Sequence, residues 1–253
     1  MSFINKVVLV TGASSGIGKA ICFHFAKLSA RLSLVDKDAE NLKKSAEECE
    51  RLSRAKVLTT VADLRNDNDV KKAIENTKHE FGRIDVVINC AGIFKPANIL
   101  DSNLIEVFDD VMSTNLRSVV YITNKVTSEL AETKGCIINV SSLTGYIGAF
   151  KSVPYNTSVA ALNHFTTCVA AELAPKGIRV NSIAPGKVKT NILQNASVEQ
   201  EASEAFWNEA SSTPLSRLVK TEDIAELAAF LASDKARAMT GSSYLIDAGL
   251  TLG

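Results

Sequence analysis

Short, almost uninterrupted apolar runs alternate along this chain with longer segments whose apolar residues recur at helical spacing. Such runs are typical of strands buried on both faces, and parallel strands need long crossover connections, which helices provide. The alternation therefore predicts an α/β fold, a doubly wound parallel sheet of about seven strands with helices on both faces. The strands are expected at residues 7–11, 31–36, 56–63, 84–89, 135–141, 179–184 and 243–247.

Helical spacing predicts where the crossovers lie. Asp67 and Thr221 stand at the positions expected for helix N-caps, and Lys176-Gly177 indicates a helix end after Pro175. The helices are expected at residues 16–28, 39–54, 66–81, 154–175 and 221–232, with a pair of helices across 104–132.

Length and composition are those of a single globular domain over residues 1–253. Hydrophobic residues make up 46% of the chain, and 28 acidic side chains balance 28 basic ones. This balance gives no electrostatic case for nucleic acid binding, and no segment approaches the run of about 18 apolar residues that spans a membrane. The strand-like run at residues 6–10 leaves no room for a signal or transit peptide, so a cytoplasmic location is expected.

The five cysteines indicate reduced thiols rather than disulfides or metal ligands. They form no CxxC pair and have no metal-ligand spacing, and the three histidines do not cluster with them. We therefore expect a reducing compartment and no metal site. The cysteines are Cys22, Cys49, Cys90, Cys136 and Cys168.

Residues 187–214 form a polar stretch between the sixth strand and the last helix. It is rich in Ser, Glu, Asn and Gln, with Phe206 and Trp207 in its middle. One interpretation is a lid over the carboxyl edge of the sheet, where doubly wound folds bind ligands. The other is a surface helical insertion whose aromatic pair packs on the body, and the two are compatible.

A glycine-rich turn connects the first strand to the first helix. Residues 11–18 have the sequence Thr-Gly-Ala-Ser-Ser-Gly-Ile-Gly. The pyrophosphate of a dinucleotide needs close approach to the backbone and free amides at a helix N-terminus, and glycines permit both because a Cβ would block the approach. An ordinary tight turn is the alternative, which the strand–turn–helix context disfavours. The turn residues expected to contact a cofactor are Gly12, Ser14, Ser15, Gly16, Ile17 and Gly18.

Asp36 ends the second strand and predicts NAD rather than NADP. A carboxylate there accepts hydrogen bonds from the adenosine ribose hydroxyls and repels a 2′-phosphate. Lys37 and Lys19 weaken this prediction, since either could meet a phosphate, but Asp36 is better placed. A strand-end turn residue is the alternative interpretation of Asp36.

Polar and small residues also end the third and fourth strands. Asp63 and Leu64 follow one strand, and Asn89, Ala91 and Gly92 end the other. Both sets are expected at the carboxyl edge of the sheet, where a carboxylate can bind the adenine amino group and small residues leave room for a nucleotide. Plain turn chemistry would use the same residues.

Together these motifs resemble the short-chain dehydrogenase/reductase family over essentially the whole chain. Cys90 replaces the more usual second asparagine of the fourth-strand motif. The matching motifs are Thr11-Gly12-x-x-x-Gly16-x-Gly18, Asp63-Leu64, Asn89-Cys-Ala-Gly92, Thr114-Asn115, Asn139-Val-Ser-Ser142, Tyr155, Pro185-Gly186 with Thr190, and Ile246-Asp247-Ala-Gly249.

The resemblance implies a Rossmann-like domain and NAD(P)-dependent interconversion of a carbonyl and an alcohol. It assigns Ser142 to the substrate oxygen, Tyr155 to proton exchange and Asn115 to a water on the relay path. It also implies a homodimer or homotetramer, with the helices at 104–132 and 154–175 in the interface. The residues implied to border the nicotinamide are Pro185, Gly186, Val188 and Thr190.

The family has a lysine four residues after the tyrosine, where this chain has Val159. Residues four apart share a helix face, and the lysine lowers the tyrosine pKa and holds the nicotinamide ribose. An unperturbed tyrosine has a pKa of about 10 and is therefore protonated at neutral pH. Because oxidation needs a base and reduction needs only a proton donor, the absence of the lysine should impair oxidation more than reduction. A substitute cation is a further alternative, and the candidates on nearby loops are Lys95, Lys151 and Lys187.

Two functions therefore remain open. The intact glycine turn, Asp36, Ser142 and Tyr155 favour an oxidoreductase over a catalytically inactive NAD-binding protein with a binding or regulatory role. A third function, that of a structural assembly subunit, is disfavoured because it needs neither the glycine turn nor Tyr155. The sequence does not identify the substrate.

Overall fold

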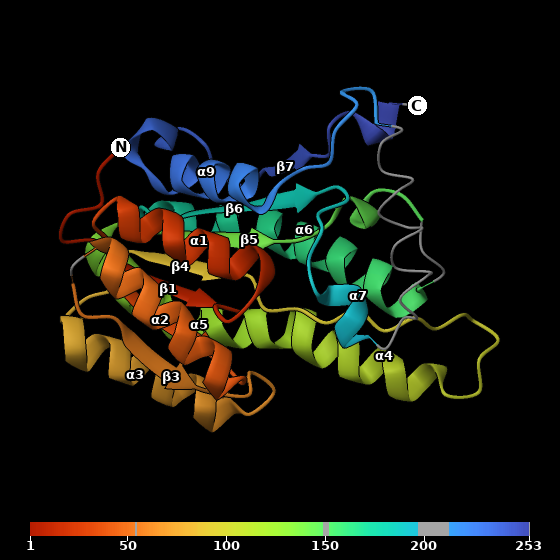
Figure 1. Ribbon diagram of the computed structural model, residues 1–253, viewed down its shortest axis with the longest axis horizontal. Helices are drawn as coiled ribbons and strands as arrows, with labels where there is room; N and C mark the ends of the chain where they lie inside the picture. The colour runs from red at the N-terminus through yellow and green to blue at the C-terminus, as the bar shows by residue number, and fades with distance from the viewer. Residues whose placement is uncertain (54, 149–151, 197–212, 253) are drawn as a thin grey trace.

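The computed structural model describes residues 1–53, 55–148, 152–196 and 213–252, which build one seven-stranded sheet with helices on both faces (Figure 1). Every strand pair is parallel, in the order β3-β2-β1-β4-β5-β6-β7. The predicted doubly wound fold is confirmed. The strands are β1 (Val7–Thr11), β2 (Arg31–Asp36), β3 (Leu58–Val61), β4 (Val86–Asn89), β5 (Cys136–Val140), β6 (Arg179–Pro185) and β7 (Ser243–Ile246).

The helices lie between the strands, as the alternation predicts. The predicted end at Lys176-Gly177 is confirmed, because Gly177 adopts a left-handed conformation with φ 77°. The α-helices are α1 (Gly16–Lys27), α2 (Ala39–Ser53), α3 (Asp67–Phe81), α4 (Leu104–Met112), α5 (Ser118–Thr133), α6 (Val153–Leu173), α7 (Ile192–Asn195) and α9 (Thr221–Ala232). Short 3₁₀ turns occur at Leu143–Gly145, Ala174–Lys176, Asp234–Ala236 and Leu250–Leu252.

Alternate residues of each central strand face opposite layers of helices. In β1, Val8 and Val10 pack in the cluster formed with α1, α2 and α9, whereas Leu9 packs in the cluster formed with α3, α5 and α6. All three side chains are at most 2% exposed. Burial on both faces explains why the strands are apolar without interruption.

The strand order places the ends of β1 and β4 side by side. β1 pairs with β2 on one edge and with β4 on the other, and the chain leaves these two strands toward opposite sides of the sheet. Open α/β sheets bind ligands at this kind of switch point, outside the carboxyl ends of the strands. The glycine turn after β1 lies there.

The predicted helix pair across 104–132 is nearly continuous. A π-helical turn, Ser113–Arg117, joins α4 to α5 without a loop. Single π turns within helices are uncommon and often occur at functional sites. This one contains Asn115.

Two predicted N-caps are wrong. The residue that caps α3 is Asn66, whose side chain accepts a hydrogen bond from the Asn68 N–H. Asp67 is instead the first helical residue, where its charge still suits the helix dipole. Lys220 precedes α9, and the Asp223 carboxylate accepts its N–H, so Thr221 lies inside the helix.

Several strand ends also differ from the predictions. β3 covers residues 58–61 rather than 56–63, and β4 begins at residue 86 rather than 84. Apolar residues continue past the paired part of a strand, so burial alone does not show where the hydrogen-bonded ladder stops. β5, β6 and β7 differ by one residue at one or both ends.

The predicted 187–214 segment is described only in part. Val188 forms a parallel bridge with Val219, and α7 follows at residues 192–195. Phe206 and Trp207 lie outside the described residues. Within the described part of the chain, no helix has the length and apolar character to cross a membrane.

Candidate active site

The glycine turn is folded as tightly as its sequence predicts. A Cβ on Gly18 would lie 2.1 Å from the carbonyl oxygen of Gly12, and one on Gly12 would lie 2.8 Å from the backbone nitrogen of Ala91. Gly12 and Gly16 have positive φ angles of 70° and 51°. A side chain at Gly12 or Gly18 would push the backbone apart, and at Gly12 and Gly16 the positive φ angles also favour glycine, so the turn depends on these residues.

This turn leaves amide groups available at the start of α1. Ser15, the N-cap residue, is extended and makes no side-chain capping bond. The first amides of a helix have no partner within the helix, and together with the helix dipole they favour an anion. Ser14 is buried, whereas Ser15, Gly16 and Ile17 are partly exposed. This geometry suits the pyrophosphate of a dinucleotide.

Asp36 lies beside the turn. Its carboxylate accepts hydrogen bonds from the N–H groups of Ser14 and Asp38, both at 3.1 Å. Its side chain is partly exposed, so it can also meet a ligand. The two basic residues that weaken the NAD prediction are Lys19 and Lys37. The Lys19 ammonium lies 5.6 Å from the centre of the Phe23 ring, and the Lys37 side chain is exposed.

The end of β4 packs directly on the turn. The Thr11 hydroxyl accepts the N–H groups of Cys90 and Ala91, at 3.1 and 3.3 Å. The Asn89 amide donates to the side chain of Asn139 on β5 at 2.9 Å, and both residues are buried. Sequence reasoning missed Thr11 as the residue joining these two strand ends, although its position directly before Gly12 was visible.

Asp63 forms a close ion pair with Arg65. Arg65 contacts its carboxylate at 2.6 Å and, through its other nitrogen, contacts Asp110 of α4 at 2.8 Å. The hydrogen bonds from Arg65 lower the pKa of Asp63 to about 2. Asp63 is therefore ionised at neutral pH, at the carboxyl edge, and Leu64 beside it is buried.

Ser142 and Tyr155 are brought together although they belong to different elements. Ser142 follows β5 and Tyr155 lies in the first turn of α6, where the Ser142 hydroxyl hydrogen-bonds the phenol. Burial raises the pKa of Tyr155 above its ordinary value, and the Ser142 bond offsets this only in part. The phenol is therefore protonated at neutral pH.

Asn115 connects three segments from the π-helical turn. Its amide oxygen accepts the Ile93 N–H at 2.8 Å, and its nitrogen donates to the Ile93 carbonyl at 2.9 Å. The same nitrogen is 3.1 Å from the Ser158 hydroxyl, which in turn donates to the Tyr155 carbonyl at 2.8 Å. Gly92 lies beside Asn115, since a Cβ there would be 3.5 Å from its amide oxygen.

Val159 lies in the core rather than at the surface. Its side chain is 4% exposed, and its carbonyl accepts the Ser141 hydroxyl at 3.1 Å. Of the proposed substitute cations, Lys95 is paired with Asp110 at 2.7 Å, and Lys187 is half-buried after β6. Lys151 lies outside the described residues.

The segment after β6 reaches the glycine turn. Pro185 ends β6, Gly186 donates its N–H to the Ile246 carbonyl at 2.8 Å, and a Cβ on Gly186 would lie 2.7 Å from Asp247. The Thr190 side chain would lie 3.2 Å from a Cβ on Gly16, while Val188 is buried. The predicted site residues of this segment therefore lie at the same edge as the turn.

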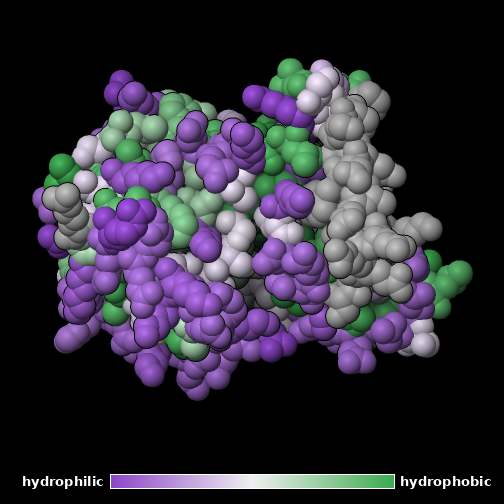
Figure 2. Space-filling view, in the orientation of Figure 1, coloured by the Kyte–Doolittle hydropathy of each residue, from purple (hydrophilic) through white to green (hydrophobic). Residues whose placement is uncertain are grey.

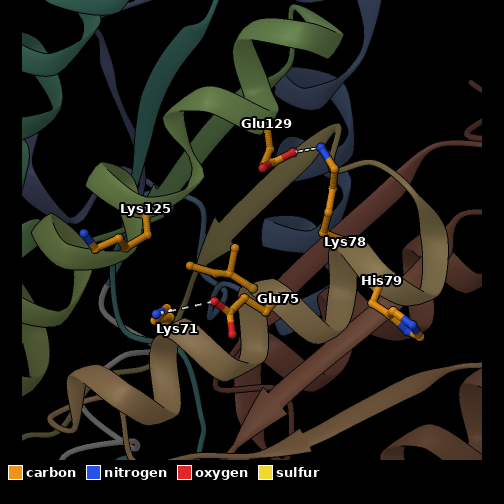
Figure 3. A pocket seen from close by; sticks show the side chains of 7 residues that line it. Lys71, Glu75, Lys78, His79, Lys125 and Glu129 are labelled. Atoms are coloured by element: carbon orange, nitrogen blue, oxygen red, sulfur yellow. Dashed lines mark hydrogen bonds and ion pairs between the residues drawn. The ribbon is translucent and has the colours of Figure 1, made fainter.

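A cavity of about 390 Å³ lies elsewhere, between α3 and α5 (Figure 3). Its charged lining is largely paired, since Lys71 lies 3.7 Å from Glu75 and Lys78 contacts Glu129. It contains none of the predicted site residues. Among the described residues no three potential ligands are grouped to hold a metal ion.

The hydropathy of the surface differs from one part of the molecule to another. Figure 2 shows a strongly hydrophilic surface over α2, and apolar side chains at the end of the molecule that includes the C-terminus. Ile99, Leu100 and Leu252, in loops on the carboxyl side of the sheet, are 69%, 92% and 85% exposed.

Comparison with known proteins gives matches over almost the whole chain. A family model described as enoyl-(acyl carrier protein) reductase matches residues 12–251. The 3-oxoacyl-acyl-carrier-protein reductase FabG of Thermotoga maritima is 36% identical, covering 100% of both chains. Cyclohexanol dehydrogenase of an Acinetobacter species is 34% identical, covering 98% of this chain and 96% of its own.

Solved structures agree with these relatives. Levodione reductase superposes with a TM-score of 0.92 and 34% identity, covering 99% of each chain. A Caenorhabditis elegans short-chain dehydrogenase/reductase of unknown function, solved with cofactor, has a TM-score of 0.92 and 32% identity, over 99% of this chain and 96% of its own.

Proposed function

Because the chain belongs to the short-chain dehydrogenase/reductase family, we propose that it uses NAD(H) to interconvert a carbonyl and an alcohol and works better as a reductase. Its relatives are named as oxidoreductases of this type, and they share carbonyl–alcohol chemistry. The cofactor, the direction and the site residues are the proposal. The observation that supports it most is the contact between Ser142 and a protonated Tyr155.

A dinucleotide fits the residues at the carboxyl edge. The glycine turn leaves no room for a Cβ, and the first amides of α1 lie at its end. Asp36 would hold the adenosine ribose and disfavour a 2′-phosphate, which makes NAD the proposed cofactor and NADP the lesser one. Residues proposed to hold it are Gly12, Ser14, Ser15, Gly16, Ile17, Gly18, Asp36, Asp63, Leu64, Asn89, Ala91, Gly92, Tyr155, Pro185, Gly186, Val188 and Thr190.

Bound NADH would supply the hydride for reduction. The residues of the chain handle the proton and the substrate oxygen. Ser142 would hydrogen-bond this oxygen, and the Tyr155 phenol would donate its proton to it as the alcohol forms. Asn115, beside Ser158 and Tyr155, would support the path that returns a proton to the phenol.

The preference for reduction follows from Val159. An apolar side chain four residues after Tyr155 supplies no positive charge, and burial raises the pKa of the phenol. A protonated phenol can donate a proton but cannot accept one. Reduction uses the form that is present, whereas oxidation needs the phenolate.

The substrate is proposed to be a small carbonyl or alcohol compound. The names of the relatives include a 3-oxoacyl-acyl-carrier-protein reductase, a cyclohexanol dehydrogenase and a levodione reductase, whose named substrates differ widely. A homodimer or homotetramer and a cytoplasmic location are proposed from the family resemblance and from the five free cysteines. Light scattering on the purified protein tests the assembly.

Titration calorimetry with NADH and NADPH tests the cofactor, and NADH-dependent reduction of a panel of ketones and aldehydes tests the activity. Tyr155→Phe should abolish reduction while NADH binding is retained. Reduction that continues unchanged in this variant would remove Tyr155 from the mechanism.

A catalytically inactive NAD-binding protein is the second candidate, and the buried Val159 favours it. It makes the same cofactor-binding prediction but a different catalytic one. Tight NADH binding without turnover of any carbonyl in the panel would support it, and failure to bind either nucleotide would exclude both functions.

A further inference from the structure

The ring of Phe94 packs against the ring of Tyr155. The ring centroids are 5.3 Å apart and the planes meet at 78°, an edge-to-face arrangement that aromatic pairs prefer. Phe94 is 9% exposed, so its ring has little freedom to turn away. The phenol therefore has an aromatic wall on one side and the Ser142 hydroxyl as a hydrogen-bond partner.

The segment that carries Phe94 is fixed on both sides of it. Before Phe94, both main-chain groups of Ile93 are hydrogen-bonded by the Asn115 side chain. After it, the Lys95 carbonyl accepts the Ser152 hydroxyl at 2.7 Å, and the Ala97 carbonyl accepts the Val153 N–H at 3.1 Å. A short loop bonded on both sides of Phe94 holds this side chain in place.

The same serine fixes both members of the aromatic pair. Ser152 is the N-cap of α6, and its hydroxyl oxygen accepts the Tyr155 N–H at 3.4 Å while donating to Lys95. The first turn of α6 and the 93–97 segment thus share one anchor. Ser152 thereby ties the main chain beside Phe94 to the main chain of Tyr155.

The segment is also held by charge on its outer side. The Lys95 ammonium contacts Asp110 of α4 at 2.7 Å, and Asp110 is 21% exposed. Arg65 contacts the same carboxylate at 2.8 Å. Lys95 is therefore directed toward α4, and its neighbour Phe94 faces Tyr155.

We propose that Phe94 is a positioning residue for Tyr155: its ring, held by the 93–97 segment, fixes the phenol in the orientation that proton donation needs. Because residue 159 is a valine, the position one helical turn after Tyr155 supplies no ammonium group to orient the phenol. The Phe94 ring orients the phenol instead. This inference rests on the proposed function, because it concerns the same tyrosine.

The test compares Phe94→Leu with Phe3→Leu. Phe3 is a matched control, since it forms an edge-to-face pair with Phe25 at 4.8 Å and 71°, is 3% exposed and lies at the opposite edge of the sheet. Phe94→Leu should lower kcat for NADH-dependent reduction by about tenfold or more, as small misplacements of reacting groups do. The KM for NADH should stay within about twofold, and Phe3→Leu should leave kcat unchanged.

A spectroscopic readout separates this inference from the proposed function. With carbon-13-labelled tyrosine, the ring signals of Tyr155 are identified by their loss in Tyr155→Phe, and their relaxation should show a more mobile ring in Phe94→Leu but not in Phe3→Leu. Relaxation reports the motion of the tyrosine ring itself, whereas its chemical shift would change through the loss of the neighbouring ring alone. This measurement needs no turnover, so it still applies if no carbonyl is reduced.

A Tyr155 ring as rigid in Phe94→Leu as in the unmodified protein, or a kcat equal to that of the unmodified protein, would overturn the proposal. Phe94→Met, which keeps a large apolar side chain without a ring, replaces the leucine variant if that one fails to fold. A more mobile Tyr155 ring in this variant supports the proposal by the same reasoning.

Discussion

The Asp36 carboxylate accepts the Ser14 N–H at 3.1 Å, which ties the end of β2 to the glycine turn after β1. The residue proposed to choose the cofactor therefore also helps to shape the turn that would bind its phosphates. Replacing Asp36 should therefore change both the preference for NADH over NADPH and the affinity for the nucleotide.

Asp36→Asn should weaken NADH binding by about tenfold or more, because charge-assisted hydrogen bonds contribute about 1.5–3 kcal/mol. NADPH binding should improve relative to NADH, since the repulsion of a 2′-phosphate is removed. Calorimetry with both nucleotides measures this ratio. Asp38→Asn is the control, because the Asp38 carboxylate contacts Asn41 at the start of α2. An unchanged ratio in Asp36→Asn would contradict the assignment.

Gly18→Ala should abolish nucleotide binding, because its Cβ would lie 2.1 Å from the Gly12 carbonyl oxygen and the turn would have to open. Gly82→Ala is the matched control. Gly82 has φ 74° with nothing within 4 Å of a Cβ, so this change should cost about 1 kcal/mol of stability and leave binding intact. Calorimetry and thermal unfolding give the two readouts, and retained binding in Gly18→Ala would exclude the turn as the phosphate site.

Val159→Lys should raise alcohol oxidation by about tenfold or more and reduction by less, since a nearby cation lowers a tyrosine pKa by about 1–3 units. Val120→Lys adds the same charge on α5, where Val120 is 41% exposed, and should change neither rate. Rates are measured in both directions on one substrate pair. No gain in oxidation would mean that another group already supplies the charge.

The unmodified protein should show different pH dependence in the two directions. Because burial raises the pKa of Tyr155, the phenol remains protonated from about pH 6 to pH 9 and reduction should vary little there. Oxidation requires the phenolate and should rise by about tenfold per pH unit over the same range. An oxidation rate that levels off near neutral pH would show that the phenol has a lowered pKa.

Lys95→Met should leave reduction within about twofold of the unmodified protein, because half-exposed ion pairs such as Lys95–Asp110 contribute only about 0–1 kcal/mol. This variant tests whether Lys95 acts as the substitute cation. A loss of kcat as large as that of Tyr155→Phe would contradict this expectation.

The sequence predicted the architecture well because burial dictates it. The apolar run and glycine turn at residues 7–18 predicted β1 and the start of α1 to the residue. Asn66 and Asp67 show where this fails: both residue types cap helices, and only the backbone conformation decides between them. The predicted ends of several strands were wrong because the apolar sequence continues beyond the hydrogen-bonded part of the strand.

The candidate site was predicted as residues but not as contacts. Ser142 and Tyr155 were visible as motifs, whereas the Phe94–Tyr155 pair and the Arg65–Asp110–Lys95 ion pairs join segments far apart in sequence. Nor did spacing indicate the π-helical turn that holds Asn115, since an extra residue in one turn leaves no distinct pattern. Such features depend on tertiary packing.

The pairing of β1 with β4 also bears on how the protein folds. β1 ends at Thr11 and β4 at Asn89, so the Thr11 hydroxyl can accept the Cys90 N–H only once residues 79 positions apart in the sequence have come together at the centre of the sheet. Contacts this distant in sequence form slowly, because the intervening loop must be closed first. Nucleotide binding during refolding would therefore report the joining of the two halves of the sheet, and a chain stalled with only its first three strands paired would have the glycines but no site.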